Sequence, residues 1–211
     1  NSIGIGINYS DWQTNMSFNF FDPYFNPDGV GLGYGAYIRS TDYSNFNISA
    51  YNTESFGGSI QFVLPINEIS QLSLSAAIDQ TDLQSDFLSS RQLLDFIASE
   101  GSKFESLTLG ASWTRNSLNR GIFPTAGTLN VVSGSVTVPG SSITYGRLSH
   151  RFKYFKPLSN NFIFGVRTEI GGLFAYGDTE TPPPYENFYA GGLNSVRGFE
   201  QNSLGPRAVY D

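Results

Sequence analysis

Residues 30–39, VGLGYGAYIR, alternate between large apolar side chains and small or polar ones. Successive side chains on a β-strand point to opposite faces of a sheet, so this stretch predicts a strand with one apolar face and one open or polar face. The first parity holds Val30, Leu32, Tyr34, Ala36 and Ile38, and the second holds Gly31, Gly33, Gly35, Tyr37 and Arg39.

The same alternation recurs along most of the chain and predicts an all-β protein of about ten strands. The predicted strands cover residues 2–8, 12–21, 30–42, 55–64, 70–82, 104–115, 127–138, 144–156, 161–176 and 185–190. One helix is predicted within 90–99, where Leu93, Phe96 and Ile97 follow helical spacing inside the longest loop. We expect its apolar stripe to cap the mouth of a barrel; the alternative is that it binds a partner.

Half-buried strands fit either a soluble β-sandwich or a transmembrane antiparallel β-barrel. The predicted strands run to about 9–12 residues, which suits a tilted membrane span better than the usual strand of a soluble sheet. Short links at 65–69 and 157–161 alternate with long ones at 43–54, 83–103 and 177–184, as in outer-membrane barrels. Two links depart from this pattern: 116–126 is long for the short side, and 139–143 is short for the long side. Aromatic residues near strand ends predict two interfacial girdles: Phe20, Phe21, Tyr24 and Phe25 at one rim, and Trp12, Tyr37 and Tyr43 toward the other. These features favour the membrane barrel.

Composition argues against several classes of function. The 211 residues are 39% hydrophobic and 14% charged, with a net charge of −6 and no cysteine. The acidic balance argues against a nucleic-acid partner, and the absence of sulfur ligands excludes a cysteine metal site. The glycines of 29–35 lack the context of a nucleotide loop, and the parity of His150 places it on an apolar face. We expect no enzymatic activity, no cofactor and no metal.

Charged residues of the later strands share the parity opposite to their apolar neighbours. An arginine facing lipid costs about 2–4 kcal/mol at mid-membrane, so these residues are expected to face the lumen. Two interpretations stay open: the charges neutralise one another and the acidic loops, or they select anions in a pore. The predicted lumen-facing charges are Arg147, Arg151, Lys153, Arg167 and Glu169.

Residues 185–207 break the alternation. This glycine-rich segment carries the isolated Arg197 between Val196 and Phe199. A plug inserted in the lumen, whose arginine needs a buried acidic partner, and a mobile surface loop both fit this composition.

Motifs in this segment carry a resemblance to a known family. VRGF (196–199) is preceded by YENFYAGG (185–192) and followed by GPRAVY (205–210). The chain resembles the BamA family of outer-membrane β-barrel assembly factors, within the POTRA-barrel insertase and translocator superfamily. Further motifs occur in the same order as in that family: DPYFNPDGVGLG (22–33), LPINEISQL (64–72), NRGIFPTAGT (119–128) and VTVPGS (136–141).

The resemblance implies a sixteen-stranded barrel, of which residues 1–211 supply roughly the second to the eleventh strand. In it, 83–103 is a long extracellular loop with a short helix, and 191–211 begins the lumenal loop six. The POTRA domains and the gate between first and last strands would lie outside this chain. Arg197 would pair with acidic residues of later strands, with Val196, Gly198 and Phe199 shaping the loop tip.

The implied function is the assembly and insertion of β-barrel proteins into the outer membrane of a Gram-negative bacterium, as core subunit of the BAM complex. Implied partners are nascent outer-membrane proteins, outer-membrane lipids and accessory lipoproteins bound through POTRA domains. The alternative is an outer-membrane protein translocator or an anion-preferring porin.

Overall fold

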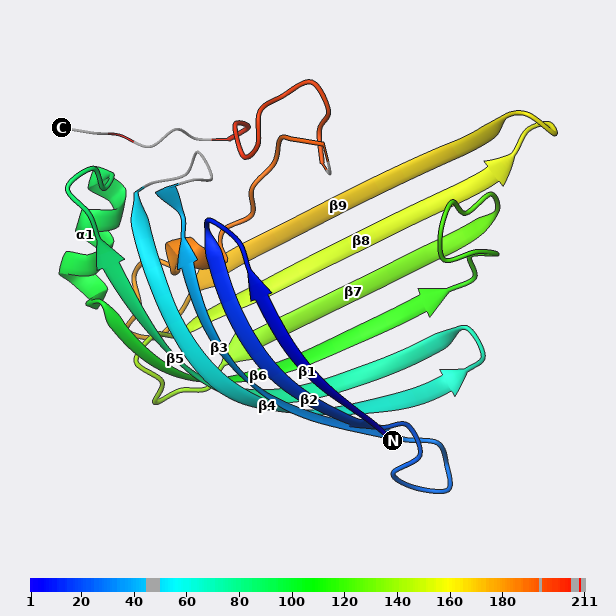
Figure 1. The fold of residues 1–211 in the computed structure, drawn as a ribbon, viewed down its shortest axis with the longest axis horizontal. Helices are drawn as coiled ribbons and strands as arrows, with labels where there is room; N and C mark the ends of the chain where they lie inside the picture. The colour runs from blue at the N-terminus through cyan, green and yellow to red at the C-terminus, as the bar shows by residue number, and fades with distance from the viewer. Residues whose placement is uncertain (45–49, 194, 206–208, 210–211) are drawn as a thin grey trace.

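The computed structural model describes residues 1–44, 50–193, 195–205 and 209. This part of the chain holds nine antiparallel strands in one sheet, in which each strand pairs with the next along the chain (Figure 1). The strands are β1 (Ser2–Tyr9), β2 (Gln13–Asp22), β3 (Gly31–Asp42), β4 (Tyr51–Asn67), β5 (Ser70–Ser85), β6 (Lys103–Asn116), β7 (Gly127–Thr137), β8 (Tyr145–Pro157) and β9 (Ile163–Ala175). A helix, α1 (Arg91–Glu100), lies between β5 and β6, and the 3-10 turn η2 (Pro184–Glu186) follows β9.

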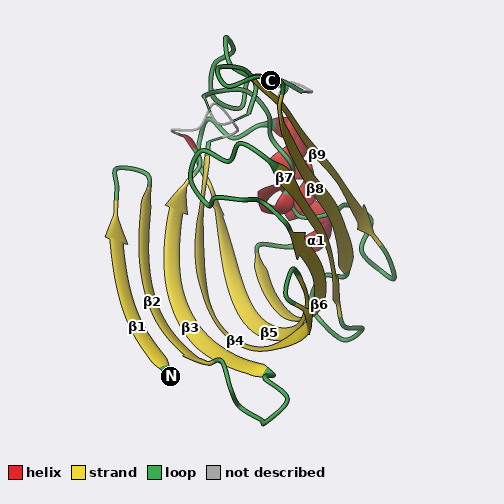
Figure 2. Ribbon diagram, turned by 90° about the vertical axis from the view of Figure 1, so that its right-hand side faces the viewer, coloured by secondary structure: helices red, strands yellow, loops and turns green. Residues whose placement is uncertain are grey.

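The sheet is strongly curved, and α1 and η2 lie on its concave side (Figure 2). Its two faces follow the parity of the sequence, because residues in one register row point to the same side. The row Leu32, Phe62, Leu74 and Ala111 lies on the convex face, and the row Gln61, Ser75, Gly110, Ser135 and Arg147 lies on the concave face. In these rows, register therefore separates an apolar convex face from a small and polar concave one.

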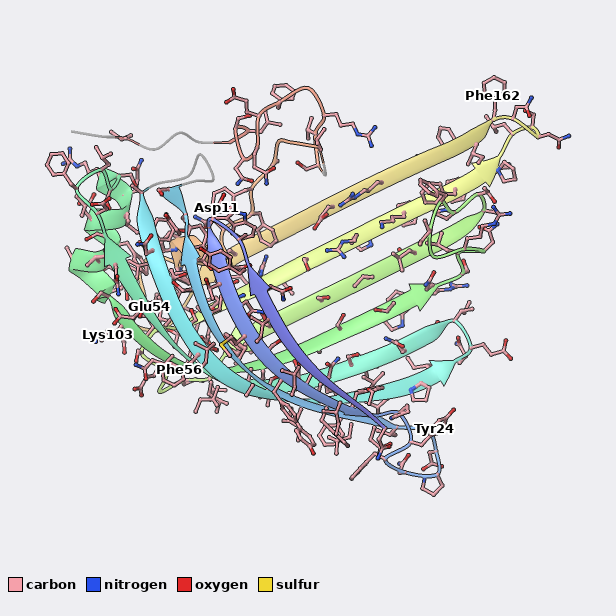
Figure 3. The ribbon with its side chains drawn as sticks, in the orientation of Figure 1. Asp11, Tyr24, Glu54, Phe56, Lys103 and Phe162 are labelled. Carbon is pink, nitrogen blue, oxygen red and sulfur yellow. The ribbon has the colours of Figure 1, made fainter. Side chains whose placement is uncertain are left out.

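Apolar side chains cover the convex face without any protein packed against them. Ile5 is 78% exposed, and Ile38 and Ile78 are each 66% exposed. In Figure 3, Phe56 points away from the concave side in the same way. Exposed apolar surface this extensive is typical of a face that contacts lipid or a partner.

The concave face of the first strands is filled by aromatic rings that lie against glycines. A Cβ at Gly31 would lie 2.8 Å from Cζ of Phe21, and one at Gly57 would lie 3.1 Å from Cε1 of Tyr37. Phe21 and Tyr37 therefore face inward, and the girdle positions predicted for them are wrong. The register, which pairs Phe21 with Gly33, decides their direction.

The predicted division into a rim of short links and a rim of long links holds only in part, because residues 10–12 alone join β1 to β2 at the α1 rim. Asn67 and Ser70 close a tight β4–β5 turn, whereas residues 86–102 form the β5–β6 connection that contains α1. The 117–126 link stays compact because Asn119 Oδ1 accepts hydrogen bonds from the backbone N–H groups of Thr125 and Ala126. No described helix is long and apolar enough to cross a membrane. Residues 45–49 of the predicted loop 43–54 lie outside the described residues.

The described buried apolar residues gather in one cluster at the α1 rim. It consists of Tyr51, Leu83, Leu93, Phe96, Phe104, Ile143 and Tyr145, with Tyr43, Ile97, Leu173 and Tyr185 packed against it. Tyr43 stacks on Tyr51 with ring centroids 4.4 Å apart, so it is a cluster residue and its predicted girdle position is wrong. The helix buries Leu93 and Phe96 here, as its apolar spacing predicts.

The predicted strand at 185–190 is absent from the structure. Pro184 starts the 3-10 turn η2, and Asn187–Tyr189 have no strand partner. Proline fixes φ and lacks a backbone donor, so the run Pro182–Pro184 prevents strand pairing at this point. The segment instead enters the concave side of the sheet (Figure 1).

Candidate functional site: the concave face and the loop after β9

The charged residues of β8 and β9 form a ladder on the concave face. Register places Arg151 opposite Glu169 and Lys153 opposite Arg167. Glu169 accepts from both arginines, with Arg151 Nη2 at 3.5 Å and Arg167 Nη2 at 3.4 Å. These side chains are about half exposed, so the pairs contribute little to stability. Lys153 has no described carboxylate within salt-bridge range.

Arg147, which lies nearer the start of β8 on the same face, binds the segment that follows β9. Its Nη1 donates to Glu186 Oε2 at 3.0 Å, and its guanidinium lies 4.5 Å from the ring centroid of Phe188. The Phe188 ring also lies over Gly171 of β9, where a Cβ would come within 2.4 Å of the ring. Glu186 and Phe188 thus attach the segment to two adjacent strands.

Glu186 carries its charge in a poorly hydrated position. Burial raises the pKa of this carboxyl above its ordinary value, and the Arg147 guanidinium opposes that shift without cancelling it. Asp79 raises the pKa further, and Arg39 lowers it. The Glu186 carboxyl group therefore depends on the Arg147 guanidinium to stay ionised.

The VRGF motif lies beyond this anchor in a closed loop. An isolated bridge joins Ala190 to Leu204, and Gly192 N–H donates to Phe199 O at 3.1 Å. A Cβ at Gly191 would lie 2.3 Å from Glu200 O, so the neck of the loop requires glycine. Val196, Arg197, Gly198 and Phe199 are all exposed at its end.

Arg197 has no ion pair with any described residue of this chain. Its pairing with acidic residues of later strands stays a prediction. Of the motif GPRAVY that follows, residues 206–208 and 210 lie outside the described residues, as does Asp211.

The concave charges share a groove with small polar side chains. A cavity of about 460 Å³ is lined by Arg147, Arg151, Glu169 and Phe188 together with serines of β5 to β8. His150 lies on the opposite, convex face, with Nε2 3.5 Å from Asn130 Oδ1. No group of acidic or histidine side chains among the described residues is arranged to hold a metal ion.

Glu186, Phe188 and Gly171 are site residues that the sequence pattern did not indicate. Alternation predicts which face Gly171 and Arg147 share, but it says nothing about a segment that leaves the sheet and returns. The signal available was an acidic and an aromatic residue close together, directly after the proline run.

Comparisons with known proteins agree with this arrangement. The family model described as the Omp85 superfamily domain matches residues 1–211. The outer membrane protein assembly factor BamA of Neisseria meningitidis serogroup B is 34% identical over 100% of this chain and 28% of its own length. BamA of Nitratidesulfovibrio vulgaris is 24% identical over 94% of this chain and 24% of its own length.

A solved structure shows the same fold. The crystal structure of BamA from Haemophilus ducreyi lacking POTRA domains 1–3 superposes with a TM-score of 0.91 at 26% identity. The match covers 99% of this chain and 42% of that one, so the chain spans less than half of the relatives it matches. The chain belongs to the Omp85 superfamily, and its curved sheet is part of an outer-membrane β-barrel like that of BamA.

Proposed function

We propose that the protein containing this chain assembles and inserts β-barrel proteins into the bacterial outer membrane, as the core subunit of a BAM complex. The observation that carries the proposal is the segment after β9, which turns back onto the concave face and presents VRGF on a closed loop. The relatives that match 100% and 94% of this chain are named as assembly factors. Its work is conformational and non-enzymatic.

Within this function, residues 1–211 act as the middle of the C-terminal barrel domain. Residues 83–103 are the extracellular connection whose helix covers the lumen at one rim, and 191–211 begin loop six. The remaining strands, the gate between the first and last of them, and the POTRA domains belong to the rest of the protein. An open sheet with unpaired edges in lipid supports this division, since every backbone group in a bilayer needs a partner.

The proposed partners follow from the same division. Nascent outer-membrane proteins would add strands by β-augmentation at the gate between the first and last strands, and lipids would contact the apolar convex face. Accessory lipoproteins would bind through the POTRA domains. Arg197, with Val196, Gly198 and Phe199, would hold the loop tip against acidic residues of later strands.

Reconstitution tests the proposal. The full-length protein with its lipoproteins, placed in liposomes, is expected to accelerate folding of an unfolded outer-membrane protein, scored by resistance to heat denaturation in detergent gels. We expect Arg197→Ala to slow this assembly, because the proposed acidic partner on a later strand would lose its counter-charge. Arg120→Ala, in the exposed β6–β7 link, is the matched control. Equal rates for the wild type and Arg197→Ala would remove the role of Arg197, and no acceleration by the wild type would remove the function.

One observation favours a second candidate, an anion-preferring pore. The concave face of β8 and β9 carries Arg147, Arg151, Lys153 and Arg167 against Glu169 alone. A pore of this kind is expected to show large, steady, anion-selective currents in planar bilayers. An assembly factor whose lumen is closed by a loop is expected to show small and irregular openings.

A further inference from the structure

The start of the loop after β9 is held to the sheet by two different contacts. Glu186 binds Arg147 of β8 through an ion pair of 3.0 Å, and Phe188 lies over Gly171 of β9. Arg147 joins the contacts, because its guanidinium lies over the Phe188 ring at 4.5 Å. A charge-assisted pair and a cation–π contact that share one arginine fix both the position and the direction of the segment.

The ring contact depends on the absence of a side chain at one position. A Cβ at Gly171 would lie 2.4 Å from both Cε1 and Cζ of Phe188, far inside van der Waals contact. A Cβ at Gly172, the next residue, would have no atom within 4 Å, and it would face the opposite side of the sheet. The two glycines therefore form a natural pair of test and control positions.

The anchor lies directly before the loop neck. Phe188 precedes Ala190, whose bridge to Leu204 closes the loop, by two residues. Gly191 and Gly192 then pack against the returning strand of the loop. Because few residues with free dihedral angles separate the anchor from the neck, the anchor determines where the VRGF tip lies relative to β8 and β9.

We propose that Arg147 and Gly171 are positioning residues, which hold Glu186 and Phe188 so that the loop carrying VRGF keeps one orientation over the concave face. Only the purpose assigned to this orientation, which is to support barrel assembly, rests on the proposed function. The orientation itself can be measured without any assembly activity.

Spin labels measure it in the full-length protein. One label is attached at Leu193→Cys, 82% exposed beside the neck, and one at Leu148→Cys, 58% exposed on the convex face of β8. A narrow distance distribution is expected for the parent. Arg147→Glu and Glu186→Arg are each expected to broaden it, because like charges then face each other. The double variant, which restores opposite charges, is expected to narrow it again.

Two comparisons separate positioning from simple loss of structure. Gly171→Ala is expected to shift or broaden the distribution, whereas Gly172→Ala is expected to leave it unchanged. Arg151→Glu, which disturbs the neighbouring ion pair without touching the loop, is also expected to leave it unchanged. Folding of each variant is checked by its heat-dependent mobility in detergent gels.

Narrow distributions in both single charge variants would overturn the proposal, and so would a double variant as broad as the singles. If wild-type protein showed no assembly activity but the distributions behaved as expected, the proposed function would fail and the anchor would stand. If assembly were normal but the charge variants left the distance distributions unchanged, the anchor would fail and the proposed function would stand.

Discussion

Single residues decide how closely the strands and rings of the concave face can approach. Gly57 shows this most clearly, since a Cβ there would lie 2.7 Å from Ile78 O and 2.9 Å from Asp79 Cβ. A backbone carbonyl cannot move aside as a flexible side chain can, so the strand pair itself must shift.

We expect Gly57→Ala to destabilise the folded barrel by about 1–3 kcal/mol, the usual cost of overpacking. Gly58→Ala is the control, because its Cβ would face the convex side at an ordinary 3.5 Å from Gly35 O. Urea unfolding in lipid vesicles, followed by tryptophan fluorescence, measures the difference. Equal midpoints for the two variants would contradict the packing argument.

The raised pKa of Glu186 predicts that the stability of the folded protein depends on pH. Burial raises its folded-state pKa above the ordinary 4.5, so the folded protein holds this proton more tightly than the unfolded chain. Its contribution to stability is complete below the ordinary pKa and is lost as the pH rises through the raised one.

Glu186→Gln removes this contribution, because the amide stays neutral. The stability of the wild type relative to the variant is therefore expected to fall as the pH rises from below 4.5 toward neutrality, as measured by urea unfolding at each pH. A difference that grows with pH would show that the Arg147 pair outweighs burial.

The sequence predicts the faces of these residues better than their partners. Parity places Arg147, Arg151, Lys153, Arg167 and Glu169 on one face, and the register agrees. It could not predict that Arg147 binds Glu186, because that contact depends on the path of a segment outside the sheet. It also misplaced Phe21, Tyr37 and Tyr43, since aromatic residues favour strands and interfaces alike.

At the level of elements, α1 connects parts of the chain that are distant in sequence. It ends at Glu100 and is capped by Gly101, whose φ is +91° and whose N–H donates to Ile97 O. Glu100 accepts from Glu180 N–H at 2.8 Å, and Gln92 Oε1 accepts from Val209 N–H at 3.0 Å. The helix therefore contacts the residues before and after the VRGF loop.

We expect Phe96→Ala to loosen this rim, because Phe96 is 3% exposed and its ring lies 5.7 Å from that of Phe104. The local cost is about 3–5 kcal/mol, as for other buried aromatic truncations. Hydrogen exchange of residues 91–100 is expected to speed up, while Leu94→Ala, at an exposed position, leaves it unchanged. Exchange that is equally slow in both variants would show that the cluster does not hold α1.

Nine of the ten strands predicted from alternation are present, and so is the helix. Alternation with a period of two residues is a strong signal for a strand where one face contacts an apolar environment and the other contacts water. The prediction failed at 185–190, where YENFYA does not keep the alternation and directly follows a proline run that no strand ladder accepts.

At the level of the whole molecule, β1 pairs only with β2 and β9 only with β8 within the described residues. Two long unpaired edges expose backbone donors and acceptors, which recruit other strands. Residues 1–211 produced alone in detergent are therefore expected to form oligomers, measured by light scattering after size exclusion. The full-length protein is expected to remain a monomer, and a monomeric isolated chain would show that the two edges are closed by another route.

The buried cluster at the α1 rim gives the molecule unequal ends. The opposite rim is held by turn hydrogen bonds such as those of Asn67 and Asn119. A barrel stiff at one end and compliant at the other does not deform uniformly when the bilayer around it changes thickness. The elastic strain collects at the compliant end, so lipid composition would set the spacing of the strands there while the α1 rim keeps its shape.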